Sequence, residues 1–376
     1  MSMQLSFGIA EFEDRLARLR GHMAAQKVQV AIIDQPVFVA YIAGYTPSDT
    51  RYRALIVPRE GEPIFALRAL DRNLAETRSW FERIIDFVDW ADPVETITEA
   101  LRSNGWAEGR IGVDLTSYAL TVDRFRRYRD LLPDAVFVDL SGVLPELRAR
   151  KSAAEIALIE RAAGIADAAM AAVVAGARIG TTARDAAKTA AAVYLDSGAD
   201  HGFTGPITIG RGEGFLHALL DDQPLAAGDI LHAELVPMVL GYSARLMRPT
   251  VVGAATAEQR RVAKALIRLQ DRQLAAMRPG APAAEVDAVL RNSLLAEGLR
   301  EAVPHTTGYT LGYYGRTGRT SDFGRNFLPT STWALAAGMT FHMYAAAKGM
   351  AFSETVLVTE DGPRRLTRTE RRLFEA

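Results

Sequence analysis

The sequence predicts two domains, an α/β domain over residues 1–150 followed by an α+β domain over residues 151–376. A chain of 376 residues is too long for one compact core, since a domain typically holds about 150 residues. Short apolar runs alternate with amphipathic stretches between residues 26 and 140, which is typical of a layered α/β domain. After residue 152 a pattern of two helices followed by strands occurs twice, which predicts a core built from two similar halves.

The composition excludes several classes of protein. Lys plus Arg number 44 and Asp plus Glu number 45, so the net charge of -1 supplies no field that would attract nucleic acid or an anionic membrane. The absence of cysteine excludes disulfides, thiolate metal sites and a thiol nucleophile. Residues 1–14 contain no apolar run, and nowhere do 18 apolar residues follow one another. We expect a cytoplasmic protein with neither nucleic-acid nor membrane partners.

The first domain is predicted from two periodicities. Amphipathic stretches at residues 93–103 and 120–131 have the 3.6-residue spacing of helices with one buried face. Between such stretches lie six short apolar runs, whose length fits strands buried in a sheet. These predicted strands are residues 30–34, 54–57, 63–66, 84–88, 111–115 and 136–140.

The second domain begins with a helix signal. Ser152 is followed three residues later by Glu155, a capping box that predicts the start of a long helix over residues 156–177. Two similar helical stretches then follow, at 176–198 and 257–298, each containing a turn with glycine. The predicted strands are 206–210, 230–238 and 242–252 in the first half, and 310–314, 339–344 and 353–359 in the second. We expect helices to cover one face of a curved antiparallel sheet, with a pocket on its other face.

Polar residues with catalytic potential gather in the second domain. Five of the six histidines lie there, namely His201, His217, His232, His305 and His342. In the apolar run 230–236, His232 and Glu234 are two residues apart and so point to the same face of a strand. A glutamate in such a strand costs several kcal/mol unless it is paired or functional, although a solvated sheet face would also accommodate it.

The segments 228–234, 305–312, 338–341 and 353–362, with the Gly241-Tyr242 pair, resemble in order and spacing the pita-bread superfamily of creatinase, prolidase and aminopeptidase P. The resemblance spans nearly the whole chain. It implies a C-terminal pita-bread domain preceded by an N-terminal creatinase-like α/β domain.

The same resemblance identifies the positions at which the metallopeptidases of the superfamily bind two metal ions. Those positions require two Asp, one His and two Glu. An arginine cannot ligate a cation, and phenols and a hydroxyl replace His and carboxylates poorly. We therefore predict neither a metal nor another cofactor. The residues that stand at these positions are Glu234, Arg245, Tyr309, Tyr344 and Ser353.

The chain is more similar to the metal-free members of the superfamily, creatinase and ectoine hydrolase, which cut C–N bonds in small metabolites. This resemblance implies that Glu234 attacks the substrate or activates a water, that His217 transfers protons, and that Glu354 holds the substrate cation. The implied substrate is a small zwitterionic or cationic metabolite that bears a carboxylate. The residues expected to complete the hydrogen-bonding wall are Tyr309, His305, His342 and Tyr344.

Departures from these relatives indicate a different pocket wall. Met247 and Tyr344 stand where creatinase has the carboxylates that hold guanidinium, which argues against creatine as the substrate. Residues 315–320 and 345–348 also differ from the corresponding elements of ectoine hydrolase. We expect ectoine-hydrolase-like chemistry on a related substrate.

The first domain is expected to contribute an arginine. The stretch before residue 54 resembles the place where creatinase dimers offer an arginine across the subunit boundary, which makes Arg51 the candidate and implies a homodimer. A guanidinium suits a substrate carboxylate because it donates two parallel hydrogen bonds. Two alternatives stay open: a metal-dependent Xaa-Pro dipeptidase or aminopeptidase, and a catalytically inactive pita-bread binding protein.

Overall fold

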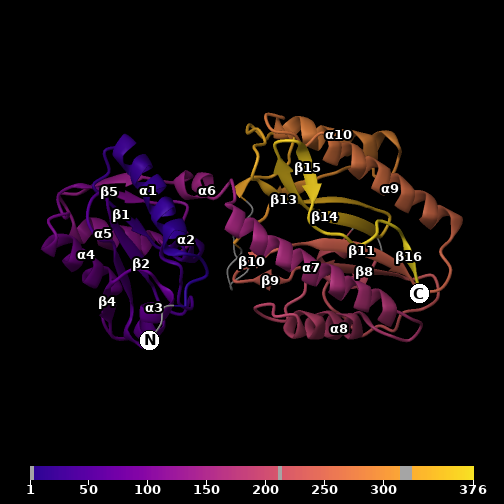
Figure 1. Cartoon of the computed structure of the whole chain (residues 1–376), viewed down its shortest axis with the longest axis horizontal. Helices are drawn as coiled ribbons and strands as arrows, with labels where there is room; N and C mark the ends of the chain where they lie inside the picture. Colours follow the sequence, from indigo (N-terminus) through magenta and orange to yellow (C-terminus); the bar gives the residue numbers. More distant parts are fainter. Residues whose placement is uncertain (1–3, 211–213, 314–323) are drawn as a thin grey trace. The chain divides into compact units, whose positions relative to one another are not determined.

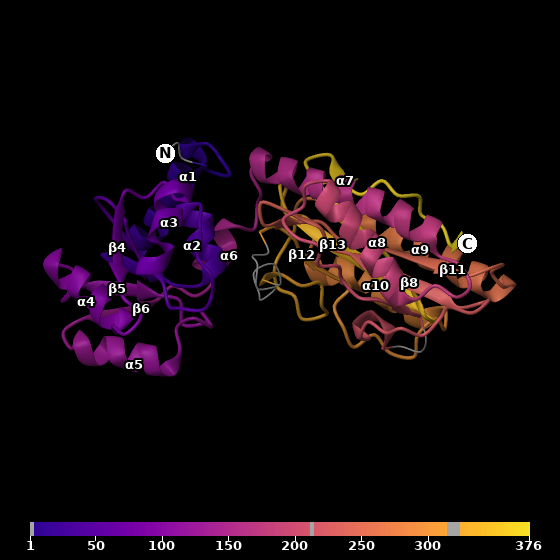
Figure 2. The ribbon, with the colours of Figure 1, turned by 90° about the horizontal axis from the view of Figure 1, so that it is seen from below.

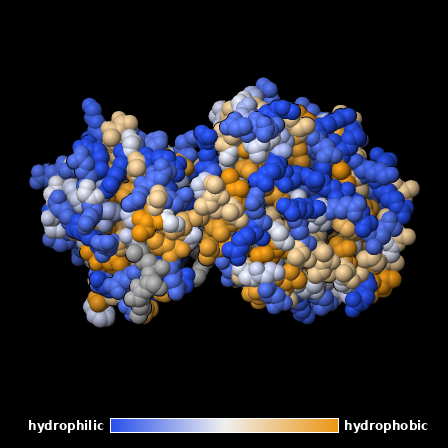
Figure 3. Space-filling view, viewed as in Figure 1, coloured by the Kyte–Doolittle hydropathy of each residue, from blue (hydrophilic) through white to orange (hydrophobic). Residues whose placement is uncertain are grey.

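The structure is a computed structural model that describes residues 4–210, 214–313 and 324–376. The chain divides into two compact units, Met1–Arg148 and Ala149–Ala376 (Figure 1). Within the described residues, no helix has the length and apolarity needed to cross a lipid bilayer. The face shown in Figure 3 carries hydrophilic residues interspersed with smaller hydrophobic areas.

The first unit is built on a six-stranded mixed sheet in the order β4-β3-β2-β1-β5-β6. Strand β1 is parallel to β5 and antiparallel to β2, and β5 is parallel to β6. All six strands predicted from apolar runs are present within a few residues of their expected ends. Their bounds are β1 Val30–Ile33, β2 Ala54–Pro58, β3 Ile64–Arg68, β4 Arg83–Phe87, β5 Arg110–Val113 and β6 Val136–Asp139.

Helices cover both faces of this sheet. Helices α4 and α5 bury Ile97, Leu101 and Tyr128 against one face, as the spacing of their apolar residues predicts. Helix α1 contacts α2 and α6. The helices of this unit are α1 Ile9–Ala25, α2 Pro36–Ala43, α3 Arg72–Arg78, α4 Pro93–Ser103, α5 Val122–Leu131 and α6 Val143–Leu147, with a 3₁₀ turn η1 at Ala69–Asp71.

The second unit is built on an antiparallel sheet whose main path runs β12-β13-β14-β11-β8-β7. Strand β15 pairs with β14, β16 pairs with β11, and β9 and β10 form a separate two-stranded ladder. The strands are β7 Ile207–Ile209, β8 Ile230–Leu235, β9 Met238–Val239, β10 Tyr242–Ser243, β11 Leu246–Val251, β12 Gly308–Thr310, β13 Thr340–Ala347, β14 Met350–Thr359, β15 Gly362–Arg365 and β16 Phe374–Glu375.

Two helix pairs lie against this sheet: α7 (Ala153–Gly176) beside α8 (Ala183–Asp196), and α9 (Ala257–Ala275) beside α10 (Ala283–Ala296) (Figures 1 and 2). The α7 and α8 helices contact β7 and β8, whereas α9 contacts β13 and β14. Apolar side chains of α9 and α10 pack on Ala345, Ala347 and Phe352. These helices therefore cover the sheet face that carries those three residues.

The two halves repeat in local detail, as the sequence predicts. Ser152 caps α7 and Thr256 caps α9, and each forms a complete capping box with the residue three positions later. Gly180 and Gly280 adopt φ values of +87° and +84°, which a residue with a side chain rarely adopts. The backbone N–H of each donates to a leucine carbonyl in the loop before the next strands. The pseudo-twofold core is thus confirmed.

Three predicted strands differ from the structure. Residues 230–238 divide into β8 and β9, and residues 242–252 divide into β10 and β11. The third strand is displaced along the chain. Residues 310–314 were expected to form a strand, but β12 spans Gly308–Thr310. Tyr309 pairs with His342 of β13, and beyond Thr310 the chain turns toward β10, where Gly312 accepts a hydrogen bond from the Ser243 N–H. The apolar pattern alone could not place this end, because pairing with a distant strand decides it.

Candidate active site

Glu234 lies on the sheet face opposite the helices of the second unit. It occupies the fifth position of β8, between β7 and β11, and only 5% of its side chain is exposed. The Arg245 guanidinium lies 3.0 Å from Glu234 Oε1. The sequence required a partner or a function for a glutamate in an apolar strand, and Arg245 is that partner.

The strand registers bring distant residues to the same face as Glu234. Glu234 pairs with Met247 across β8 and β11, Met247 pairs with Ser353 across β11 and β14, and Ser353 pairs with Tyr344 across β14 and β13. Directly opposed residues of antiparallel strands share a face, and Arg245 shares it because it precedes Met247 by two residues. The five residues that stand at metal-ligand positions by resemblance therefore gather on one face: Glu234, Arg245, Tyr309, Tyr344 and Ser353.

A chain of hydrogen bonds extends from Glu234 into the second half of the sheet. Arg245 Nη1 donates to Glu234 Oε1 at 3.0 Å and to the Tyr309 hydroxyl at 2.7 Å. That hydroxyl also lies 2.8 Å from His342 Nδ1. The guanidinium carbon stands 5.3 Å from the centre of the Tyr309 ring, a cation–π distance. Arg245 thus joins the Glu234 carboxylate to Tyr309 and His342.

Aromatic rings form the rest of the wall. The Tyr344 ring stacks on His342 with centroids 5.3 Å apart and on His305 with centroids 5.7 Å apart. The Tyr344 hydroxyl lies 3.4 Å from His305 Nδ1. Phe215 and Met247 belong to the same apolar cluster as Tyr309 and Tyr344. Of the predicted wall residues, the structure brings Tyr309, His305, His342 and Tyr344 together.

Burial and Arg245 have opposite effects on the pKa of Glu234. Burial raises the pKa of the Glu234 carboxyl above its usual value, while the Arg245 charge and hydrogen bond, and then the His217 charge, lower it. Burial, and next the Arg245 cation, hold the pKa of His342 well below its usual range. Near neutral pH, His342 is therefore an uncharged imidazole.

His217 lies at the exposed end of the site. It closes the 3₁₀ turn η2 (Phe215–His217), which is anchored by the hydrogen bond from Thr208 Oγ1 to the Phe215 carbonyl. The His217 side chain is exposed, yet its charge acts on the buried Glu234. A histidine in this position can exchange protons with solvent, as a general acid or base must.

Glu354 and Glu234 lie on opposite faces of the sheet. The predicted contact of Glu354 with the substrate cation therefore does not fit the structure. Glu354 pairs with Met343, and this pair is next to the Ser353–Tyr344 pair along the two strands. Because adjacent residues of a strand point to opposite faces, Glu354 points to the helix-covered face. There it is fully buried, 2.8 Å from Arg248 Nη2. Thr367 also donates to it, and Arg371 lies 3.2 Å away. Glu354 is a structural ion-pair partner behind the sheet.

The hydrogen bonds of Arg248 compensate for the burial of its ion pair with Glu354. Its guanidinium is fully buried, and every donor of the group has an acceptor. Besides Glu354, the acceptors are the carbonyls of Met247, Ser353, Thr369 and Glu370. The pair therefore ties the strands that carry Met247 and Ser353 to the C-terminal segment.

Two other predicted features remain, one in the first unit and one largely outside the described residues. Arg51 is an exposed residue of the first unit, just before β2, and its charge acts on Asp89 of the same unit. The neighbouring Arg53 is buried and paired with Asp49. Most of the segment 315–330 that was expected to shape the pocket wall, including residues 315–320, lies outside the described residues.

Sequence reasoning did not anticipate two contributions to this site. Gly205 lies so close to β8 that an added Cβ would stand 2.8 Å from Glu234 Cγ and 2.8 Å from its carbonyl oxygen. Arg245 was recognised as a residue that cannot bind a metal, but its role as the partner of Glu234 was not. The alternation of residues 243–247 could have placed Arg245 on the Met247 face, whereas nothing local marked Gly205.

The donor set does not fit a dinuclear metal site. The five residues at the positions implied by the resemblance supply one carboxylate, two phenols, one hydroxyl and an arginine that donates a hydrogen bond to the carboxylate. Protein sites for divalent cations use carboxylates, imidazoles or thiolates and do not place a cation among the ligands. Within residues 4–210, 214–313 and 324–376, no group of three or more His, Cys, Asp or Glu side chains could hold a metal ion.

Comparison with known sequences identifies the family. The profile of metallopeptidase family M24 matches residues 157–360, and that of the creatinase/prolidase N-terminal domain matches residues 15–150. The chain belongs to family M24.

Relatives of this M24 chain have more than one activity. It is 25% identical to the Xaa-Pro dipeptidase of Pyrococcus furiosus over 96% of the chain and 100% of that protein. It is 24% identical to the ectoine hydrolase of Halomonas elongata over 100% of the chain and 99% of that protein. Its fold matches the prolidase of Pyrococcus horikoshii with a TM-score of 0.83 at 22% identity, over 96% of the chain and 99% of that structure. These similarities establish a hydrolase family and the pita-bread fold.

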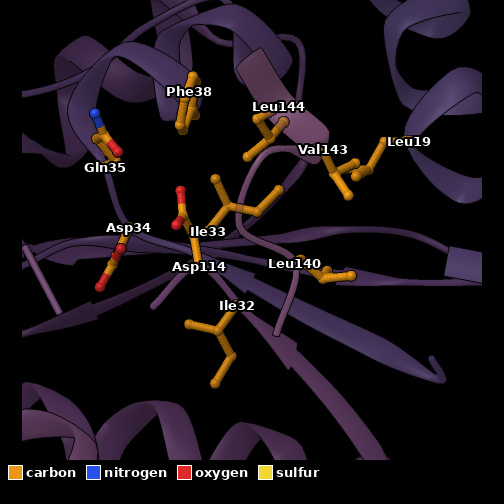
Figure 4. A pocket seen from close by; sticks show the side chains of 10 residues that line it. All are labelled: Leu19, Ile32, Ile33, Asp34, Gln35, Phe38, Asp114, Leu140, Val143 and Leu144. Atoms are coloured by element: carbon orange, nitrogen blue, oxygen red, sulfur yellow. The ribbon is translucent and has the colours of Figure 1, made fainter. Parts of the chain in front are cut away.

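The first unit contains a second buried polar cluster, which is separate from this face. Asp34 and Asp114 follow β1 and β5 and border a cavity of about 10 Å³, otherwise lined mainly by apolar side chains (Figure 4). Tyr52 and Ser117 both donate hydrogen bonds to Asp34, at 2.9 and 2.6 Å. Burial raises the pKa of Asp34 to about 6. A cavity of this size has room for about one water molecule and is too small for a metabolite.

Proposed function

We propose that this protein is a metal-independent hydrolase that cuts an amidine or amide C–N bond, other than a peptide bond, in a small metabolite bearing a carboxylate. The supporting observation is the contact between Arg245 and Glu234 at 3.0 Å, two residues that stand at metal-ligand positions by the resemblance. The positive charge of the guanidinium balances the negative charge of the Glu234 carboxylate. It therefore favours the ionised form of that carboxyl group. The carboxylate is then available for reaction with the substrate instead of for metal binding.

In the proposed reaction Glu234 acts in one of two ways. As a nucleophile, its oxygen forms a bond to the substrate carbon while the C–N bond breaks and the electron pair of that bond goes to nitrogen. Water then hydrolyses the mixed anhydride that an amide gives, or the imino counterpart that an amidine gives, and releases Glu234 as the carboxylate. As a general base, it takes a proton from a water whose oxygen attacks the same carbon. In both cases His217 gives a proton to the leaving nitrogen, because an amide or amidine nitrogen leaves poorly unless it is protonated.

The wall residues would position the substrate. Tyr309, Tyr344, His305 and His342 supply ring faces and hydrogen-bonding groups beside Glu234. We further propose that a homodimer is the active form and that Arg51 of one subunit meets the substrate carboxylate in the other. An exposed arginine is free to meet a second subunit.

Proton NMR of the EDTA-treated protein with ectoine, hydroxyectoine, creatine and a Xaa-Pro dipeptide in one tube tests the proposal. Loss of ectoine or hydroxyectoine despite EDTA is the expected result. Glu234→Gln should abolish that turnover, whereas Glu301→Gln, which changes an exposed glutamate, should retain it.

Two results would overturn the proposal. Turnover of the dipeptide only after addition of Mn²⁺ or Zn²⁺ would identify a metal-dependent Xaa-Pro peptidase, the activity named for several relatives. Saturable binding of these compounds without turnover, with and without metal, would instead identify an inactive binding protein.

A further inference from the structure

We propose that Ser353 Oγ and His342 Nε2 form a pair of hydrogen-bond donors that binds an anionic oxygen of the substrate, such as a carboxylate oxygen. The inference rests on the proposed function in taking this face as the substrate site. It goes further in naming Ser353 as a binding residue and in assigning the proton of His342 to Nε2.

The assignment for His342 follows from the hydrogen bonds of Tyr309. Arg245, a permanent cation with donors only, donates to the Tyr309 oxygen at 2.7 Å. Accepting a hydrogen bond from a cation polarises the hydroxyl and makes its own proton a stronger donor. His342 Nδ1 lies 2.8 Å from that hydroxyl and therefore accepts its proton. A neutral imidazole that accepts at Nδ1 carries its hydrogen at Nε2.

Both proposed donors lack a hydrogen-bond partner among the residues that the structure describes. His342 Nε2 and Ser353 Oγ have no hydrogen-bond partner among the described residues, and both side chains are completely buried. A buried donor without an acceptor destabilises the folded protein, because it has lost its hydrogen bond to water. Two such donors on one face of a sheet indicate a place where a ligand supplies the acceptor.

The register places the two donors close together. Ser353 lies opposite Tyr344 and His342 lies opposite Thr355, so Ser353 and His342 are diagonal neighbours on adjacent strands. Diagonal neighbours on one face are about 7–8 Å apart at the backbone, and a carboxylate between two such side chains can accept from both. Arg245, Tyr344 and Tyr309 retain 9%, 8% and 7% exposure beside them, so solvent reaches this face.

The charge of the surroundings favours an anion over a neutral acceptor. Arg245 is the charged group nearest to His342 along the hydrogen bonds that link them. Both residues bond to the Tyr309 hydroxyl. Glu234 lies two strands from Ser353, with only Met247 between them in the register, a backbone separation of about 10 Å. A small metabolite can therefore place its carboxylate at Ser353 and His342 while its C–N bond lies near Glu234.

Long-range ¹H–¹⁵N NMR of histidine-labelled full-length protein tests the assignment without relying on turnover. With six histidines in the chain, the signals of His342 are identified by their loss in His342→Gln. The expected pattern is that of a neutral imidazole protonated at Nε2 between pH 6 and 8. A neutral imidazole protonated at Nδ1, or a cationic one, would overturn the assignment.

Titration with acetate, using acetamide as the uncharged control, tests the donor pair. Acetate should shift the His342 Nε2–H signal in a saturable way, and acetamide should do so at least about tenfold more weakly. Ser353→Ala should weaken the acetate response about five- to tenfold, and Ser353→Thr should restore part of it, because threonine keeps the hydroxyl. Ser103→Ala, in helix α4 of the first unit, is the matched control that should change nothing.

The NMR result separates this inference from the proposed function. Two results would overturn the donor pair even if C–N hydrolysis were observed. One is a His342 Nε2–H signal that does not shift when acetate is added, and the other is an acetate response that Ser353→Ala leaves unchanged. Conversely, an acetate response that depends on Ser353 supports the donor pair even if the compounds tested for hydrolysis were not turned over.

Discussion

Removing the guanidinium of Arg245 should destabilise the second unit in a way that depends on pH. Arg245→Met keeps much of the side-chain volume but leaves Glu234, whose side chain is 5% exposed, without its cation. Breaking a buried ion pair by removing one partner typically costs about 3–5 kcal/mol. The Tyr309 hydroxyl also loses the donor that lies at 2.7 Å. We expect a loss of about 3–5 kcal/mol in unfolding free energy at pH 8.

The pH dependence follows from the pKa of Glu234. Burial already raises this pKa, and without Arg245 it rises further, so the folded state binds the proton more tightly than the unfolded chain. The contribution of such a group to stability is fully present below the unfolded pKa and is lost as pH rises through the folded pKa. The variant should therefore lose less stability at pH 5 than at pH 8, because lower pH favours the protonated form of Glu234.

Urea unfolding followed by the fluorescence of Trp333 measures this effect. Trp333 is the one tryptophan after residue 148, so a background with Trp80, Trp90 and Trp106 changed to Phe reports on the second unit alone. Arg268→Met is the matched control, because Arg268 pairs with Glu297 at the surface of the same unit and such pairs contribute about 0–1 kcal/mol.

A double-mutant cycle with Glu234→Gln isolates the pair. We expect a coupling energy of about 2 kcal/mol at pH 8, because Arg245→Met should cost much less once position 234 carries no charge. A coupling below about 0.5 kcal/mol, or an equal loss at pH 5 and pH 8, would refute the interpretation of Arg245 as the cation that holds Glu234 charged.

Other parts of the chain give three further predictions. Glu354→Gln should lower the unfolding free energy by about 3 kcal/mol, while the KM of the folded enzyme stays unchanged. A raised KM would show that Glu354 contacts the substrate after all. Gly205→Ala should lower kcat at least about tenfold by displacing Glu234, whereas Gly164→Ala, where an added Cβ meets nothing within 4 Å, should not; equal kcat values in both variants would contradict the packing argument. Burial raises the pKa of Asp34 from 3.8 to about 6, so this residue stabilises the fold below pH 3.8 and loses that contribution as pH rises through 6. Chemical unfolding should show wild type gaining about 2 kcal/mol relative to Asp34→Asn between pH 7.5 and 4.5, and a constant difference would contradict the raised pKa.

Several features of this protein are determined by the sequence alone, because they depend on neighbours within a few residues. Six apolar runs gave the strands of the first unit, and the capping box of Ser152 and Glu155 marked the start of α7. Strict alternation along β8 placed His232 and Glu234 on one face. The resemblance to the pita-bread superfamily, not a local pattern, implied that Arg245 stands at a metal-ligand position.

The tertiary structure decided which of these residues meet. Arg245, Tyr309 and His342 are separated by 64 and 33 residues along the chain, and only the antiparallel registers bring them into one hydrogen-bonded chain. A shift of one residue in register exchanges the two faces of a sheet, and Glu354 lies behind the site because it follows Ser353 by one position. Local patterns could not fix these pairings, since the free energy that selects a register comes from burying the whole face against distant helices.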